Sequence, residues 1–283
     1  MRVIMRVRRS ARWGWFLALA LAAGGVASAA SADTVAHWRF EPGAGRFTRN
    51  EGPVALRLVG LGVDGTRPSE VAVTPTSAAA RYPSAGPNLG AARFEGKLFQ
   101  VFRVLGEQPP ADLLGESFTL EALVRLDSIA RRTYATILAH GGGWDGSMAW
   151  QLIVTGSDSS HGAGQLLFQF STDGTMQDGL ATLKPDIQLE IGKRYYVAFA
   201  FDANQTSPEG AVFHVASAED GWAIRTRPVE RKVRGLFASS VPLSIGAGLR
   251  ERGAGYNCWD GVIEEVRLTR GQLAVGDLLL APR

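Results

Sequence analysis

Apolar and polar residues alternate in short segments along this chain, and glycine, proline, asparagine or aspartate separates one segment from the next. The clearest segment is Ser117–Leu126, in which every second residue from Phe118 onward is apolar. A period of two is that of a half-buried β-strand, whose successive side chains point to opposite faces of a sheet. The 34 glycines and 13 prolines interrupt the chain too often for long helices. The pattern therefore predicts an all-β fold, a sandwich or barrel of antiparallel strands.

Further segments show the same strand pattern. They are Val35–Phe40, Ala91–Phe94, Leu98–Val104, Thr136–Ala139, Ala149–Val154, Gln165–Phe170, Tyr195–Phe201, Ala211–Val215, Leu243–Ile245 and Gly261–Leu268. Tyr195–Phe201 is apolar on both faces, which predicts a central strand. One helical turn is expected near Val275–Leu279. Residues 66–90 are rich in proline, alanine and serine, and we expect them to form a long surface insertion within the domain.

Residues 1–32 have the composition of a secretory signal peptide. Five arginines precede the apolar run Trp15–Ala23, and small residues at Ala27–Ala29 and Ala30–Ala32 fit a cleavage site. The run is too short to span a bilayer. We therefore expect an exported protein, secreted or periplasmic, with no membrane span after cleavage and a single domain over residues 33–283.

The charge balance changes once the signal is removed. The whole chain has 30 Lys and Arg against 27 Asp and Glu; without the five signal arginines, 25 basic residues face 27 acidic ones, a net charge of −2. The densest basic stretch, Arg225–Arg234, is diluted by Pro228 and Glu230, and we expect a solvated loop or edge strand there. The sequence thus predicts no nucleic-acid partner.

Cys258 is the one cysteine of the chain. An exported domain with one cysteine has no internal disulfide and depends on its core for stability. No cysteine follows the apolar run of the signal to accept a lipid. We expect Cys258 to pack as a small apolar group rather than to react as a thiol.

Six motifs occur in the order found in a known family. They are Val35–Glu41, Ala91–Gly96, Ser117–Val124, Ile191–Asp202, Leu243–Ala247 and Gly261–Leu268. In this order the chain resembles laminin-G-like domains of the concanavalin A-like lectin/glucanase superfamily, over essentially all of residues 33–283. The resemblance implies a jelly roll of two antiparallel sheets, one curved around a concave face that holds carbohydrate in some relatives.

The resemblance also provides a test for catalysis. Glucanases of this fold carry a Glu-x-Asp-x-x-Glu strand, and this chain has none. Glu264 and Glu265 are adjacent, so strand geometry predicts that they point to opposite faces, and Glu219–Asp220 precede Gly221, where a solvated turn is expected. The histidines show no metal-ligand spacing; they are His37, His140, His161 and His214. No catalytic residue is predicted.

The superfamily implies a structural calcium that joins the first and last strands. The matching positions are Glu41, the carbonyl of Gly96, and Glu264, where the family usually has aspartate. Counting by twos puts Glu264 in an apolar row with Val266 and Leu268, and a buried carboxylate there needs a partner. The alternative to calcium is a pair with an arginine such as Arg39, or hydrogen bonds from backbone amides.

Two loop clusters suggest ligand binding. Gly141–Gly146 contains Trp144 and Asp145, and the segment before the last strand contains Tyr256, Asn257, Trp259 and Asp260. Sugars stack on exposed aromatic faces, and carboxylate or amide groups bind their hydroxyls. The alternative is that the two tryptophans are buried under the loops, as Trp150 and Phe168 are expected to be in the core.

Together these features predict a non-catalytic recognition module that binds carbohydrate or an extracytoplasmic protein. Two alternatives stay open, a divergent glycoside hydrolase on the same fold and a domain that serves only assembly.

Overall fold

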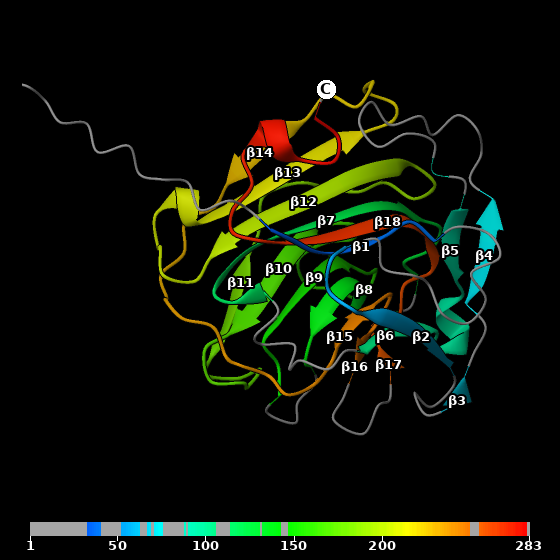
Figure 1. Ribbon diagram of the computed structural model, residues 1–283, viewed down its shortest axis with the longest axis horizontal. Coiled ribbons are helices and arrows are strands. Elements are labelled where there is room, and N and C mark those ends of the chain that lie inside the picture. Colours follow the sequence, from blue (N-terminus) through cyan, green and yellow to red (C-terminus); the bar gives the residue numbers. More distant parts are fainter. Residues whose placement is uncertain are drawn as a thin grey trace, which may run out of the picture. The chain divides into compact units, whose positions relative to one another are not determined.

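Two antiparallel sheets lie face to face in the computed structural model (Figure 1). The structure describes residues 33–40, 52–62, 67–68, 71–75, 88, 90–105, 114–130, 132–142, 147–249 and 255–281. The all-β prediction is confirmed, since helix within these ranges is limited to Leu114 and to the short 3-10 turns η1 (Gly96–Leu98), η2 (Pro208–Gly210) and η3 (Val275–Asp277). No helix of the described residues is long and apolar enough to cross a membrane.

The first sheet contains the longest strands. Its order is β14 (Arg225–Pro228), β13 (Ala211–Ser217), β12 (Arg194–Asp202), β7 (Ser117–Leu126), β18 (Gly261–Arg270), β5 (Gly90–Phe94) and β4 (Ala72–Pro75), and β1 (Thr34–Trp38) also pairs with β18. β12 lies between β13 and β7 and is buried along most of its length, which confirms the prediction of a central strand. β14 is an exposed edge strand, one of the two structures expected for this basic stretch.

The second sheet packs against the first. Its order is β11 (Leu180–Leu183), β10 (Leu166–Ser171), β9 (Trp150–Thr155), β8 (Tyr134–His140), β15 (Leu243–Ile245), β6 (Val101–Leu105), β2 (Arg57–Gly62) and β3 (Arg67–Pro68). A separate hairpin joins β16 (Gly248–Leu249) to β17 (Gly255–Tyr256). Strands β3 and β4 fall within residues 66–90, so the expectation that this stretch is only a surface insertion is corrected: part of it extends the edges of both sheets.

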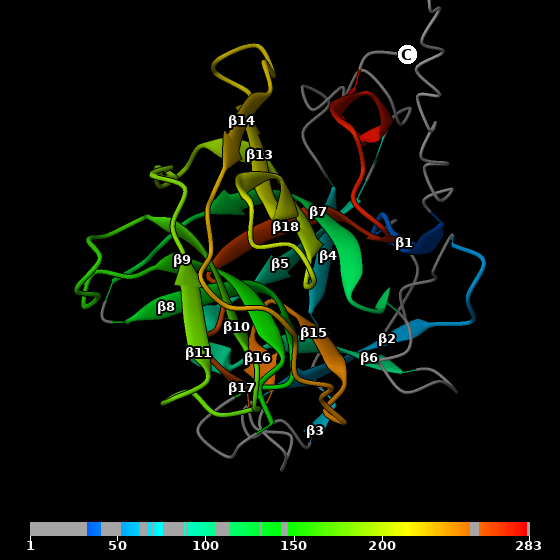
Figure 2. The ribbon, with the colours of Figure 1, turned by 90° about the vertical axis from the view of Figure 1, so that its left-hand side faces the viewer.

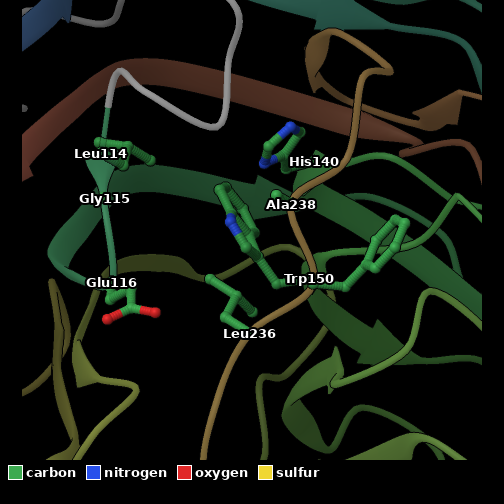
Figure 3. Close-up of a pocket in the computed structure, with 8 residues that line it drawn as sticks. Leu114, Gly115, Glu116, His140, Trp150, Leu236 and Ala238 are labelled. Carbon is green, nitrogen blue, oxygen red and sulfur yellow. The ribbon is translucent and has the colours of Figure 1, made fainter.

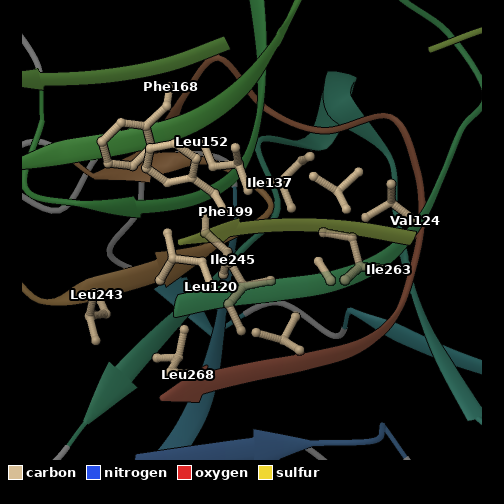
Figure 4. Packing of buried hydrophobic residues seen from close by; sticks show 14 of the residues in the cluster. Leu120, Val124, Ile137, Leu152, Phe168, Phe199, Leu243, Ile245, Ile263 and Leu268 are labelled. Atoms are coloured by element: carbon tan, nitrogen blue, oxygen red, sulfur yellow. The ribbon is translucent and has the colours of Figure 1, made fainter. Parts of the chain in front are cut away.

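The core lies between the sheets. Phe168 of β10 and Phe199 of β12 stack with ring centroids 4.0 Å apart, and Figure 4 shows aliphatic side chains of both layers around them. Trp150 and Phe168 are both buried in this cluster, as predicted. Each large side chain removed from water in this way contributes about 1.5–3 kcal/mol.

A β-bulge interrupts β18 and reverses a prediction. Ile263 is opposite Val124 and Glu265 is opposite Leu123, so Glu264 is the extra residue of the bulge. Ile263 before the bulge and Val266 after it both belong to the core cluster. Glu264 does not share their face, and the predicted apolar row is wrong because counting by twos assumes an uninterrupted pairing.

The chain after β18 covers the outer face of the first sheet. Leu278, Leu279 and Leu280 pack with Leu123 of β7 and Tyr196 of β12 in a second apolar cluster. This segment is red in Figure 1, beside β12 and β13. It contains η3, the helical turn predicted from the sequence. This segment therefore covers the part of the outer face that β7, β12 and β13 form.

Candidate functional site

A long connection closes one end of the sandwich. Residues 229–242, here called the strap, run from β14 to β15 across the end that faces the viewer in Figure 2. The Gly235 amide donates to the carbonyl of Ala203 at 2.9 Å, and the Phe237 amide donates to the carbonyl of Ser171 at 2.9 Å. These two bonds tie the strap to the ends of β12 and β10. The strap therefore spans both sheets.

Arg231 anchors the strap. Its guanidinium lies 4.7 Å from the centroid of the Phe201 ring and donates to the carbonyls of Asp202 and Gln205. Burial lowers the pKa of Arg231 from its ordinary value, although the coulombic attraction of Asp202 opposes this. A guanidinium stacked on an aromatic face and bonded to carbonyls holds its position well. The strap is thus fixed before it reaches Leu236.

A pocket of about 110 Å³ lies under the strap (Figure 3). Its lining residues come from three parts of the chain: Leu114, Gly115 and Glu116 before β7; His140 and Trp150 from the β8–β9 pair; and Leu236, Phe237 and Ala238 of the strap. The walls are mostly apolar, with three groups able to form hydrogen bonds. This is the candidate binding site.

His140 is neutral in this pocket. Desolvation by burial lowers its pKa from 6.5 to about 4, although its hydrogen bond to the Ser239 carbonyl favours the charged form. Nε2 lies 3.1 Å from that carbonyl oxygen, which can only accept, so Nε2 carries the proton. Nδ1 then has a free lone pair, and no bond joins it to any residue in the described ranges. His140 is therefore a hydrogen-bond acceptor at the pocket.

Trp150 supplies the complementary donor. Its ring packs against Phe118, Phe168 and His140, with centroids 5.5, 6.1 and 6.0 Å away. Within the part of the chain that the structure describes, its indole N–H donates to no acceptor. In Figure 3 this nitrogen lies on the side of the ring turned toward Leu114 and Gly115. The ring nitrogen itself is not fully buried, so it is a donor that a ligand in the pocket can reach.

Glu116 adds a carboxylate beside the opening. Its Oε2 accepts a hydrogen bond from the side-chain amide of Asn204 at 2.9 Å, which fixes the orientation of the group. The residue is exposed and keeps further acceptor capacity toward solvent. It is the one acidic residue among those that line the pocket.

The two predicted ligand loops meet beside this pocket. A Cβ on Gly142 would lie 2.0 Å from the Tyr256 hydroxyl oxygen, so the tyrosine is packed directly against the Gly141–Gly146 motif. The Ser239 hydroxyl of the strap donates to the carbonyl of Ser147 at 2.5 Å, which joins the same loop to the strap. Tyr256 thus contacts Gly142, two residues after His140, but it does not line the pocket, and Trp144 and Asp145 lie outside the described residues.

The other predicted ligand residues have structural contacts. Trp259 is 0% exposed and belongs to the core, so its predicted role in stacking a sugar is corrected: the ring fills the sandwich. The Asn257 carbonyl accepts from the Thr136 amide at 2.7 Å, and the Asp260 carboxylate lies 3.6 Å from Arg132. Cys258 is buried, and burial raises its pKa to about 11, in agreement with a packed apolar role.

The residues expected to hold calcium do not fit a metal site. Glu264 is paired with Arg194 at 3.0 Å, and the strand register places Gly96 beyond Phe94, the partner of Gly261. A guanidinium already neutralises the carboxylate that calcium would need. Among the described residues no three His, Cys, Asp or Glu side chains gather as a metal site requires, and Glu41 lies outside them.

The adjacent carboxylates of β18 are both structural. Because of the bulge, Glu264 and Glu265 lie on the same outer face of the first sheet, which corrects the prediction of opposite faces. Each is buried and paired, Glu264 with Arg194 and Glu265 with His37 at 2.5 Å. Neither faces the pocket, so neither is available to a ligand there.

The outer face of the second sheet also carries polar residues, as a carbohydrate-binding face would. Gln151 donates to Gln169 at 2.6 Å, and Gln169 donates to Thr182 at 3.1 Å, in one row across β9, β10 and β11. Gln151 is 1% exposed and Gln169 is 3% exposed. A sugar cannot reach side chains so deeply covered, which favours the pocket at the end of the sandwich.

Comparisons with known proteins agree with the fold. No family model matches the sequence, and no curated protein matches it. Among solved structures, domain 4 of AbnA, an extracellular arabinanase of Geobacillus stearothermophilus in complex with arabinotriose, is 14% identical; the match covers 86% of this chain and 95% of that one, with a TM-score of 0.52. The likeness shows a shared fold.

A second structure shows how widely this fold is used. The enzymatically active domain of tailspike protein 2 of bacteriophage CBA120 is 13% identical to this chain, which covers 30% of its length, and the TM-score is 0.52 over 78% of this chain. One similar structure is thus a sugar complex and the other is described as an active enzyme. Function has to be argued from the site itself.

Most of the residues that line the pocket carry no recognisable signal in the sequence. Leu114, Leu236 and Ala238 are unremarkable in sequence and meet only because the strap crosses the sandwich end. The one usable sign was the position of His140 directly before the Gly141–Gly146 motif.

Proposed function

We propose that this protein is an exported, non-catalytic carbohydrate-binding module whose site is the pocket under the strap. The observation that carries the proposal is that the indole N–H of Trp150 and the Nδ1 acceptor of the adjacent His140 ring have no partner among the described residues, in a pocket that Glu116 borders. Sugars offer hydroxyls that both donate and accept, together with apolar C–H faces. The pocket supplies the matching groups.

A single carboxylate argues for binding rather than hydrolysis. Retaining and inverting glycosidases use two acidic residues on either side of the scissile bond, about 5–10 Å apart. Glu116 is the only acidic residue that lines the described pocket, and Glu219 and Asp220 lie in the exposed turn between β13 and β14. The complex of the arabinanase domain with arabinotriose supports the same proposal by analogy of fold. The apolar N-terminal segment supports export.

The proposal is tested in two steps. The full chain is first applied to a glycan array, and the release of reducing sugar is then measured on each glycan that binds. We expect binding without release. The variant Ala238→Phe places a ring at an exposed position of the pocket lining and should abolish binding without disturbing the core. Ala223→Phe, the same change in the exposed turn between β13 and β14, is the matched control and should bind normally.

Three results would contradict the proposal. Release of reducing ends would show a hydrolase. Binding that survives Ala238→Phe would show that the sugar uses another surface. Failure on every glycan, with a stable complex recovered with an extracytoplasmic protein, would favour an assembly domain.

A further inference from the structure

We infer that the pocket under the strap takes the acetamido group of an N-acetylated sugar. The inference rests on the proposed function and names the sugar class that the site recognises. It follows from three features of the pocket: the two ring nitrogens without a partner in the described part of the chain, the apolar walls and the small volume.

The two nitrogens require a ligand group with one acceptor and one donor. The Trp150 indole N–H can only donate, and the neutral His140 Nδ1 can only accept. A secondary amide carries both functions in one group, a carbonyl oxygen that can accept from the indole and an N–H that can donate to the imidazole. An ether or ester oxygen has no proton to donate to His140.

The walls distinguish an acetamido group from a hydroxyl. Leu114, Leu236, Phe237 and Ala238 give the pocket an apolar surface that a hydroxyl would leave uncovered. The acetyl methyl would remove that surface from water, and each buried methyl or methylene contributes favourably to binding. A sugar with only hydroxyls would place polar groups against these side chains, which is unfavourable.

The size agrees with this assignment. The pocket holds about 110 Å³, and one water occupies about 30 Å³ of liquid, so the space corresponds to about four waters. An acetamido group has four non-hydrogen atoms. The sugar ring would then lie at the mouth, where the exposed carboxylate of Glu116 can accept hydrogen bonds from its hydroxyls.

Isothermal titration of the full chain with N-acetylglucosamine and with glucose tests the inference, since the two sugars differ only in the acetamido group. We expect N-acetylglucosamine to bind at least tenfold more tightly than glucose. Trp150→Phe keeps an aromatic ring in the core but removes the donor together with part of the ring system, so it should weaken N-acetylglucosamine binding about threefold to tenfold. Ala238→Phe should abolish binding, and Ala223→Phe should leave it unchanged.

The outcomes separate this inference from the proposed function. Equal affinity for the two sugars, with glycan binding that Ala238→Phe still abolishes, would overturn the acetamido assignment and leave the carbohydrate-binding site intact. Binding of neither sugar, with no positive glycan on the array, would overturn both. An N-acetylated amino-acid amide that binds as tightly as N-acetylglucosamine would show that the pocket recognises an acetylated peptide, and this too would overturn the assignment.

Discussion

Glu264 and Arg194 form an ion pair at 3.0 Å on the outer face of the first sheet, at the position where a β-bulge adds Glu264 to β18. The side chain of Glu264 is 2% exposed, and that of Arg194 is 19% exposed. A carboxylate removed from water to this extent is tolerated because a cation lies beside it. The bulge, the carboxylate and the arginine therefore act as one structural unit.

Removal of the Glu264 carboxylate should destabilise the fold. In Glu264→Ala, Arg194 loses the carboxylate with which it pairs, and breaking a buried pair in this way costs about 3–5 kcal/mol. Urea denaturation measures the loss. Glu219→Ala, in an exposed turn, should change the free energy of unfolding by less than about 0.5 kcal/mol. A loss below about 1 kcal/mol for Glu264→Ala would show that the pair contributes little.

Calcium should leave the melting temperature unchanged. Arg194 already occupies the side of Glu264 that a cation would need, and a second positive charge there is repelled. Thermal melting in millimolar calcium and in chelator measures the effect, because a ligand that binds only the folded state raises the melting temperature. A rise that disappears in Glu264→Ala would restore the calcium site predicted from the family.

The histidine of the pocket should make stability depend on pH. The pKa of His140 is 6.5 in the unfolded chain and about 4 when folded, so the unfolded state binds the proton first as pH falls. The contribution is fully present above pH 6.5 and is lost as pH falls toward 4, by about 3 kcal/mol in total. Urea denaturation at several pH values measures this loss.

The control for this prediction is His140→Gln, whose side-chain amide can still donate to the Ser239 carbonyl. Burial also lowers the pKa of His214, so some dependence on pH will remain in the variant. The difference in pH dependence between the wild type and His140→Gln therefore gives the contribution of His140. If the free energy of unfolding depends on pH equally in the wild type and in His140→Gln, a neutral, buried His140 would be contradicted.

The covering segment after β18 depends on Glu121. This carboxylate accepts the Tyr196 hydroxyl at 2.6 Å and the Leu279 amide at 2.7 Å, and it pairs with Arg267. The pKa of Tyr196 is raised, first by desolvation and then by the charge of Glu121. Glu121→Ala removes the acceptor and the charge together, so the segment should detach locally.

Hydrogen exchange measures this prediction. We expect the Leu279 amide to exchange at least tenfold faster in Glu121→Ala than in the wild type. The exchange rates of amides in β10, in the other sheet, should change only as far as the global free energy of unfolding changes. Tyr196→Phe removes one hydrogen bond and keeps the charge, so its effect should be smaller. Equal exchange at Leu279 in the wild type and in Glu121→Ala would contradict the role of this carboxylate.

The sequence predicts individual strands better than their faces. Ser117–Leu126 and Leu243–Ile245 were predicted with the observed bounds, because alternation and flanking turn residues define a strand locally. Gly261–Leu268 was predicted as a strand, and Val266 and Leu268 face the core as predicted, yet the faces of Ile263 and Glu264 were wrong, since nothing in the local pattern shows a bulge. Leu180–Leu183 was missed because its residues are only partly buried and lack clear alternation.

The site was less predictable than the fold for a similar reason. The pocket depends on Leu236 and Ala238 of the strap, whose path is set by the anchor Arg231 and by amide bonds to Ala203 and Ser171. These contacts join residues that are between 26 positions (Arg231 and Gln205) and 66 positions (Phe237 and Ser171) apart in the chain, which no periodic pattern encodes. Trp259 shows the converse: aromatic composition alone did not distinguish a core side chain from an exposed one.

A side chain at Gly142 should destabilise the protein less when Tyr256 is removed. Its φ of 154° is unfavourable for other residues, and a Cβ would lie 2.0 Å from the Tyr256 hydroxyl oxygen. We expect Gly142→Ala to destabilise the protein by about 1–3 kcal/mol through overpacking and strain. In the Tyr256→Ala background the overpacking disappears and only the backbone strain remains, so the cost should fall. A double-mutant cycle by urea denaturation measures this coupling, and additive effects would show that the two residues do not touch.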